Sequence, residues 1–229
     1  MTGITEHVII VAAGSGSRFG ANVPKQYCSL AGVPVLIHTL RRISSVMPNA
    51  RQLLVISSDM EDLWLGLCRI HNFRSPEYVF GGATRFHSVK SALRALDGKT
   101  SDNDIVYIHD AARPLLKADV IERLRKSVVS DSAPGVVPVI PLSDSIRKLH
   151  DNGLSEAVDR DLFRAVQTPQ AFRFCKIAKA YTQEYNPRFT DDASVAEHYF
   201  NQPVMMTEGS VDTLKITNSR DLAFVATLL

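Results

Sequence analysis

Arg18 and Lys25 are the residues of this 229-residue chain whose type and spacing most clearly could do chemistry. They follow a segment of two alanines, two glycines and two serines at positions 12–17. Small residues let backbone N–H groups come close to a ligand, and glycine permits turns that aim successive N–H groups at one point. Two cations would neutralise charge that the amides cannot. The segment therefore predicts a polyphosphate-binding loop, whereas a lone Gly-x-Gly would indicate only a turn.

This loop departs from two common phosphate-binding templates. The dinucleotide fingerprint G-x-G-x-x-G, started at Gly14, requires a glycine at position 19 and finds Phe19. The P-loop template fails at the same place, and Ala21, which follows Gly20, is not the lysine that the template requires after its second glycine. The sequence therefore disfavours a nicotinamide-dependent dehydrogenase and predicts a phosphate loop of another type.

Further candidate site residues follow other apolar runs. Asp110 and Arg113 come just after the run at 105–108, where a carboxylate beside a guanidinium could bind a hydroxyl, a metal or an anion. A mutual ion pair is the alternative interpretation. Paired glycines at 81–82 open a predicted helix and leave its N-terminus accessible to a ligand. The sequence thus offers cations, a carboxylate and backbone amides, and it contains no nucleophile motif. This set of groups favours phosphoryl or nucleotidyl transfer.

The elements that must position these residues alternate along the chain. Strands are expected at 8–12, 53–57, 78–80, 105–108, 135–140 and 204–206, and helices at 35–43, 60–70, 83–96, 118–129, 174–185, 193–199 and 219–228. This alternation predicts an α/β fold, a mostly parallel sheet with helices on both faces. Ligands of such sheets lie at the carboxyl ends of the strands.

Residues 143–169 break the alternation. Charged residues stand among short apolar pieces in this segment, and Asp151-Asn152-Gly153 is a strong turn signal. We expect a hairpin-like arm. Because so polar a segment cannot build a core of its own, it should pack on another surface, such as a second subunit; a solvated surface hairpin is the competing interpretation.

Composition indicates one domain over residues 1–229, with 45% hydrophobic and 22% charged residues. A net charge of +2 argues against a dedicated nucleic-acid-binding protein. Three cysteines, odd in number and far apart, fit a reducing compartment and no structural metal. Without a signal-like or long apolar segment, we expect a cytoplasmic protein with no membrane contact.

Taken together, these motifs resemble those of the 2-C-methyl-D-erythritol 4-phosphate cytidylyltransferase family. The similar positions keep their order and span nearly the whole chain: 12–18, 24–26, 81–88, 109–114, 159–160, 168–170, 190–194 and 215–217. The resemblance implies a Rossmann-like nucleotidyltransferase fold with an arm that reaches into the other subunit of a homodimer. It also implies a reaction of CTP with methylerythritol phosphate that releases pyrophosphate and uses Mg²⁺, held mainly by the CTP phosphates.

The same resemblance implies roles for individual residues. The triphosphate and the charge at the α-phosphorus would be handled by Arg18, Lys25 and Lys215. CTP would be bound, largely through backbone groups, by Ala12, Ala13, Gly14, Gly16, Gly82, Ser88 and Asp110. The acceptor would be bound by Asp110, Arg113, Ser145, Arg160, Thr168 and Thr190, with Arg160 supplied by the other subunit's arm.

Two positions depart from the family pattern. Ala83 stands where an acidic residue is frequent, so a side-chain contact is absent there, and Ser145 replaces a threonine but keeps the hydroxyl. The nearest alternative is a cytidylyltransferase for ribitol 5-phosphate or a related pentitol phosphate. The Ala111-Ala112 pair and the arm favour methylerythritol phosphate. A nucleotide-binding protein without turnover is disfavoured, because pure binding does not require cations that converge on one phosphate.

Overall fold

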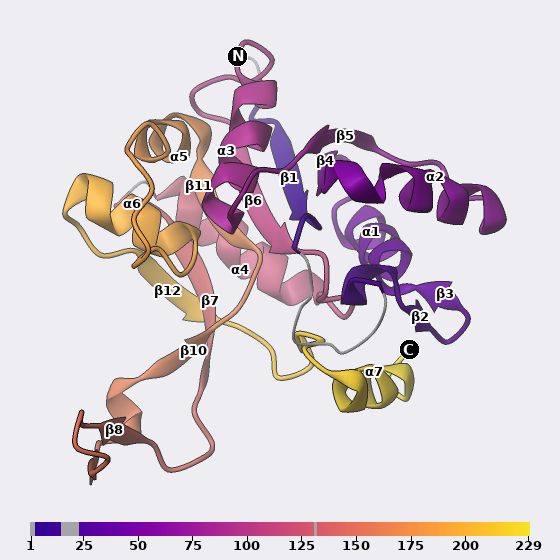
Figure 1. Ribbon diagram of the computed structural model, residues 1–229. Coiled ribbons are helices and arrows are strands. Elements are labelled where there is room, and N and C mark those ends of the chain that lie inside the picture. Colours follow the sequence, from indigo (N-terminus) through magenta and orange to yellow (C-terminus); the bar gives the residue numbers. More distant parts are fainter. Residues whose placement is uncertain (1–2, 15–22, 131) are drawn as a thin grey trace.

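The computed structural model describes residues 3–14, 23–130 and 132–229, and one central sheet organises this part of the chain (Figure 1). Its strands are β1 (Glu6–Val11), β4 (Arg51–Ile56), β5 (Glu77–Phe80), β6 (Ile105–Asp110), β7 (Val136–Pro141), β10 (Arg164–Val166), β11 (Gln170–Arg173) and β12 (Met205–Glu208). They lie in the order β10-β7-β11-β6-β1-β4-β5, and β12 also pairs with β7. The strands β5, β4, β1 and β6 are mutually parallel, while β11 and β10 are antiparallel to their neighbours. The predicted mostly parallel sheet is therefore confirmed.

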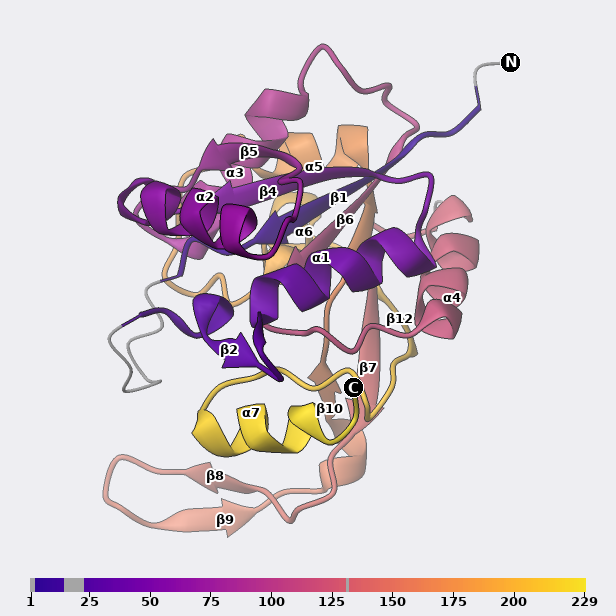
Figure 2. The same cartoon turned by 90° about the vertical axis from the view of Figure 1, so that its right-hand side faces the viewer.

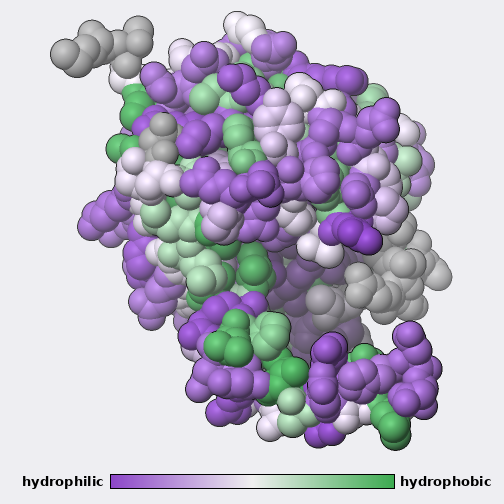
Figure 3. All heavy atoms as spheres, turned by 90° about the vertical axis from the view of Figure 1, so that its left-hand side faces the viewer, coloured by the Kyte–Doolittle hydropathy of each residue, from purple (hydrophilic) through white to green (hydrophobic). Residues whose placement is uncertain are grey.

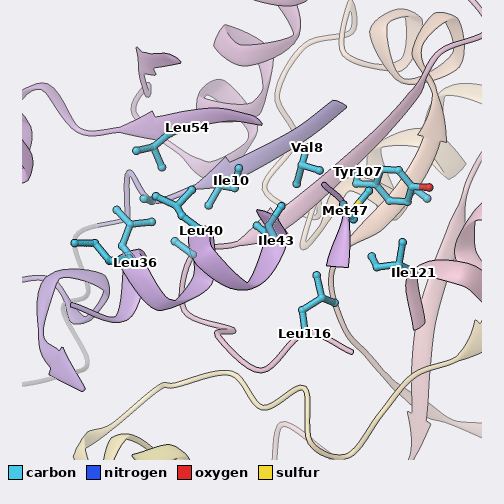
Figure 4. Close-up of a cluster of buried hydrophobic side chains, with 14 of the residues drawn as sticks. Val8, Ile10, Leu36, Leu40, Ile43, Met47, Leu54, Tyr107, Leu116 and Ile121 are labelled. Atoms are coloured by element: carbon cyan, nitrogen blue, oxygen red, sulfur yellow. The ribbon is translucent and has the colours of Figure 1, made fainter. Parts of the chain in front are cut away.

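Helices cover both faces of this sheet. The helices are α1 (Val35–Val46), α2 (Glu61–Ile70), α3 (Arg85–Leu96), α4 (Ala118–Val129), α5 (Phe174–Ala180), α6 (Asp192–Phe200) and α7 (Ser219–Ala226). One hydrophobic cluster packs α1, α2 and α4 against one face, and Figure 4 shows part of it around Leu40, Ile10 and Tyr107. A second cluster packs α3, α5 and α6 against the opposite face. The result is the layered α/β architecture that the alternation predicts.

Three short 3₁₀ helices and two small hairpins complete the described elements. The 3₁₀ helices are η1 (Lys25–Tyr27), η2 (Ser58–Met60) and η3 (Arg160–Leu162); the hairpin strands are β2 (Ser29–Leu30), β3 (Val33–Pro34), β8 (Arg147–Leu149) and β9 (Ser155–Ala157). The β8–β9 hairpin projects away from the sheet at the lower end of the molecule (Figures 1 and 2). A hairpin-like arm is thus present.

Three details differ from the sequence-based expectations. Residues 164–166 fall inside the expected arm but form β10, which pairs with β7 in the main sheet. The strand β11 was not predicted, because only Ala171 and Phe172 in this four-residue segment are apolar. The helix expected at 174–185 ends at Ala180.

No helix in the described part of the chain has the length and hydropathy to span a bilayer.

Candidate active site

A pocket of about 450 Å³ lies at the carboxyl ends of the parallel strands. The ends of three strands are level there, because Val11 of β1 is in register with Val55 of β4 and with Asp110 of β6. The pocket is lined from five places in the chain: Val11, Ala12, Ala13 and Gly14 at and after the end of β1; Lys25 and Gln26 of η1; Gly82, Ala83, Thr84, Arg85 and Ser88 around the start of α3; Asp110, Ala111 and Ala112 at and after the end of β6; and Lys215 and Thr217 after β12. A pocket is therefore present at the edge of the sheet where the sequence predicts that a ligand binds.

Gln26 fixes the backbone that leaves β1. Its side chain is buried, and its Nε2 donates to the carbonyl oxygens of Ala12 at 2.6 Å and Gly14 at 3.0 Å. The N–H of Ala12 in turn donates to Val55 O at 2.8 Å. These bonds leave a fixed backbone edge facing the pocket. Sequence reasoning gave Gln26 no role, because a glutamine in a short loop carries no signal of its partner.

Glycine is required at positions 81 and 82 because neighbouring side chains lie too close to leave room for a Cβ atom. A Cβ on Gly81 would lie 2.5 Å from Ala13 Cβ, and a Cβ on Gly82 would lie 2.5 Å from His87 Cβ. The N–H of Gly82 donates to Ser88 Oγ at 3.2 Å, and that hydroxyl donates to Thr84 O at 3.0 Å. Ser88 therefore acts in this structure by holding the glycine turn at the pocket wall.

Three cations surround Asp110. Lys215 Nζ lies 2.7 Å from Asp110 Oδ2, and the Nε atoms of Arg85 and Arg113 each lie 3.7 Å from one of its carboxylate oxygens. Burial alone would raise the pKa of Asp110, but Arg85, Lys215 and Arg113 outweigh burial and hold this pKa well below its usual range. The pocket thus contains a carboxylate that stays ionised inside an excess of positive charge, which suits an anionic ligand.

A model of the 2-C-methyl-D-erythritol 4-phosphate cytidylyltransferase family matches residues 6–229 of the chain. This chain belongs to that family. The relative from Bacteroides thetaiotaomicron bears the same enzyme name and is 39% identical over 225 residues, covering 98% of this chain and 99% of the relative. A relative from Bacillus velezensis is 36% identical over 225 residues, which cover 97% of this chain and 94% of the relative. The crystal structure of the Francisella tularensis enzyme superposes with a TM-score of 0.80 at 29% identity, covering 98% of this chain and all of that one.

The pocket brings together many, but not all, of the residues expected to act in a cytidylyltransferase. Those that line it are Ala12, Ala13, Gly14, Lys25, Gly82, Ser88, Asp110 and Lys215. Arg18 and Gly16 lie outside the described residues. Ser145 and Arg160 are exposed on the arm, away from the pocket lining, and Arg160 Nη1 donates to Ser143 O. Thr190 is exposed just before α6. Their roles at the site stay predictions.

Arg113 and Thr168 are buried, and both contact Asp110 without lining the pocket themselves. Arg113 Nη1 donates to Thr213 O at 2.8 Å, while its Nε has no hydrogen-bond partner and faces Asp110. The ion pair considered from the sequence is therefore formed. Thr168 Oγ1 accepts from Asp110 N–H at 3.1 Å and lies 3.2 Å from His109 Nδ1. In this structure Thr168 holds the strand end that carries Asp110.

His109 completes this hydrogen-bonded chain. Its side chain is fully buried, and Nε2 lies 3.1 Å from Arg113 O. A neutral ring that donates from Nε2 and accepts at Nδ1 satisfies both partners. Burial lowers the pKa of His109 to about 4, although the negative charge of Asp110 acts in the opposite direction. The neutral imidazole thus positions both Asp110 and Arg113.

The buried neutral histidine predicts a stability change in acid. Because the pKa of His109 is about 4 when folded and about 6.5 when unfolded, its contribution is complete above pH 6.5 and is lost as the pH falls toward 4. The unfolding free energy should therefore drop by about 2 kcal/mol more between pH 7.5 and pH 5 in the parent than in His109→Gln. Urea unfolding of both proteins at the two pH values checks this. An identical drop in both would contradict it.

Proposed function

We propose that this chain transfers the cytidylyl group of CTP to 2-C-methyl-D-erythritol 4-phosphate. An oxygen of the acceptor phosphate attacks the α-phosphorus in line, the bond from that phosphorus to the oxygen bridging to the β-phosphate breaks, and pyrophosphate leaves with that oxygen. The product is 4-diphosphocytidyl-2-C-methyl-D-erythritol. The observation that supports this most strongly is the convergence of Lys25, Lys215 and fixed backbone edges on one pocket at the end of the sheet.

Charge stabilisation is the proposed role of the lysines. Negative charge develops on the oxygens around the α-phosphorus during transfer, and cations aimed at that position lower the barrier. Lys25 and Lys215 enter the pocket from opposite ends of the chain, one on η1 and one after β12. Lys215 is 42% exposed and paired with Asp110, so it can exchange part of this contact for a phosphate oxygen. Arg18 is proposed to join them from the loop after β1.

Backbone groups are proposed to recognise the base. The edges at 12–14 and at Gly82 are held by Gln26 and Ser88, so their N–H and C=O groups are fixed before the nucleotide arrives. A wrong base would leave unpaired those polar groups of these edges that have no partner within the protein, which costs about 1–3 kcal/mol for each lost contact. Fixed edges of this kind favour one pyrimidine over purines.

Mg²⁺ is proposed as the cofactor, held by the phosphates of CTP. Among the described residues, no group of three or more potential ligands from His, Cys, Asp and Glu occurs. Asp110 is the single carboxylate in the described pocket lining, and cations already surround it. This donor set fits a metal that arrives with the triphosphate. When bound, the ion neutralises phosphate charge and orients the leaving pyrophosphate.

The donor is tested by measuring pyrophosphate release from CTP, UTP, ATP and GTP in turn, with methylerythritol phosphate as acceptor. We expect kcat/KM for CTP to exceed that for each other nucleotide by at least about tenfold, because each lost base contact is worth about that factor. Release should stop with excess chelator and return with added Mg²⁺. Equal turnover of ATP or GTP would contradict the proposed base recognition.

A homodimer formed through the arm is also proposed. The β8–β9 hairpin and the segment after it expose large apolar side chains, including Leu149 (80% exposed), Leu154 (65%) and Leu162 (79%). Figure 3 shows apolar patches on this lower part of the molecule. Because exposed apolar side chains grouped on one projecting segment mark contact surfaces, they support packing of the arm on a second copy.

A cytoplasmic location is proposed in addition, supported by the three free cysteines.

A further inference from the structure

Arg85 joins two acidic groups that belong to different parts of the site. It is the first residue of α3, directly after the capping residue Thr84, and its side chain lines the pocket. Nη1 and Nη2 donate to the two carboxylate oxygens of Asp192 at 2.8 and 2.6 Å. Nε lies 3.7 Å from Asp110 Oδ1. One guanidinium therefore connects the first turn of α6 to the end of β6.

The Asp192 end of this link is held rigidly. The Asp192 side chain is 0% exposed, and Tyr181 donates its hydroxyl hydrogen to Oδ1 at 2.6 Å. Gln170 of β11 fixes the same helix start, since its Nε2 donates to Asp191 Oδ2 and its Oε1 accepts from Ala193 N–H, both at 2.8 Å. A bidentate pair with so little freedom sets the position of the whole guanidinium.

At the Asp110 end the contact is looser and electrostatic. Lys215 sits at 2.7 Å from this carboxylate, while Arg85 and Arg113 remain at 3.7 Å. When Lys215 turns toward a phosphate, Asp110 loses its closest cation inside a partly buried site. Arg85 and Arg113 limit the free-energy cost of that exchange, because they leave two cations near Asp110. A partly buried carboxylate without a nearby cation would be strongly destabilised.

We propose that Arg85 is a positioning residue: fixed by Asp192, it holds Asp110 and leaves Lys215 able to exchange this carboxylate for the reacting phosphate. The inference rests on the proposed cytidylyl transfer, in which Lys215 acts on the α-phosphorus. It assigns a role in turnover to a pair that would otherwise be a structural salt bridge between α3 and α6.

The chain contains a matched control at a distance from the pocket. Arg125 donates from Nε and Nη2 to the two oxygens of Glu6 at 2.7 and 2.8 Å, and Tyr107 donates to Glu6 Oε1 at 2.7 Å. This group likewise joins an arginine, a carboxylate and a tyrosine, and its arginine is also bidentate, through Nε and Nη2 where Arg85 uses Nη1 and Nη2. None of its members lines the described pocket. The same substitutions in both groups therefore separate loss of stability from loss of turnover.

The main test compares Arg85→Lys with Arg125→Lys. Lysine keeps the charge but cannot hold Asp192 at two points and face Asp110 together. We expect kcat to fall at least about tenfold in Arg85→Lys at saturating substrates, and to stay within about twofold of the parent in Arg125→Lys. In an Asp110→Asn background the effect of Arg85→Lys on kcat should shrink to about twofold or less, because the group through which Arg85 acts is gone.

A milder pair of variants keeps the test informative if Arg85→Lys does not fold. Tyr181→Phe removes one hydrogen bond to Asp192, and Tyr107→Phe removes its counterpart to Glu6. We expect about a twofold to fivefold loss of kcat in the first and none in the second. An unchanged kcat in both Arg85→Lys and Tyr181→Phe, or an equal Arg85→Lys loss with and without Asp110, overturns the inference. Failure of the parent to form the cytidylyl product would instead overturn the proposed function.

Discussion

A Lys25→Ala variant should lose about 10²–10³-fold or more in kcat while it keeps its fold. Lys25 lies on η1 and lines the pocket, and the neighbouring Gln26 bonds to the backbone after β1. If the ammonium stabilises charge that appears only as the acceptor oxygen approaches the α-phosphorus, its removal raises the barrier of the chemical step itself. Initial rates over a matrix of CTP and acceptor concentrations separate kcat from KM.

Lys99→Ala is a suitable control for this substitution. Lys99 is an exposed lysine paired with Glu77 on the surface, outside the described pocket lining, so its loss should leave both constants unchanged. A Lys25→Ala protein with parental kcat and only a raised KM for CTP would show that Lys25 binds ground-state phosphate and nothing more.

The second large effect is recovery of activity in mixed dimers. Arg160 lies on the arm, and it is not part of the described pocket lining of its own chain. We therefore propose that each site combines Lys25 of one subunit with Arg160 of the other. Lys25→Ala and Arg160→Ala homodimers should each be nearly inactive. Unfolded together in equal amounts and refolded, they should form mixed dimers as half of all dimers.

In such a mixed dimer one site carries both substitutions and the other carries neither. About a quarter of all sites should then regain parental geometry, if assembly is statistical and the sites are independent. Native mass spectrometry confirms that mixed dimers are present, and each homodimer refolded alone is the control. Mixed dimers without recovered activity would contradict the shared site, because Arg160 acting in its own chain leaves every site with one substitution.

The parallel part of the fold could be predicted from the sequence for a simple reason. The runs around Ile9, Leu54 and Ile108 are fully buried strands, so they are continuously apolar and stand out from the helices between them. The strand β11 carries no such signal, because Gln170 and Arg173 occupy half of its length. Its antiparallel place between β6 and β7 follows from tertiary pairing, which a single sequence does not reveal.

The site was predictable where function resides in local motifs, and not where it depends on distant partners. The cation Lys25 and the glycines at 81–82 were found by type and by place after a strand, whereas Lys215 was indicated only by the resemblance to the family. The link from Arg85 to Asp192 spans 107 positions along the chain, so spacing could not suggest it. The hydrogen bonds of Gln26 to the loop after β1 were missed because a single glutamine can bond almost any backbone.

Transfer to methylerythritol phosphate is tested most directly by competition between two acceptors in one vessel. Limiting CTP is offered with equal concentrations of methylerythritol phosphate and ribitol 5-phosphate, and the two cytidylyl products are quantified by mass spectrometry. Their ratio equals the ratio of kcat/KM for the acceptors, whatever fraction of the protein is active. We expect 4-diphosphocytidyl-2-C-methyl-D-erythritol to exceed the ribitol product by about a hundredfold or more, as for a site whose polar groups pair with only one substrate. Equal amounts of the two products, or an excess of the ribitol product, would contradict the claim.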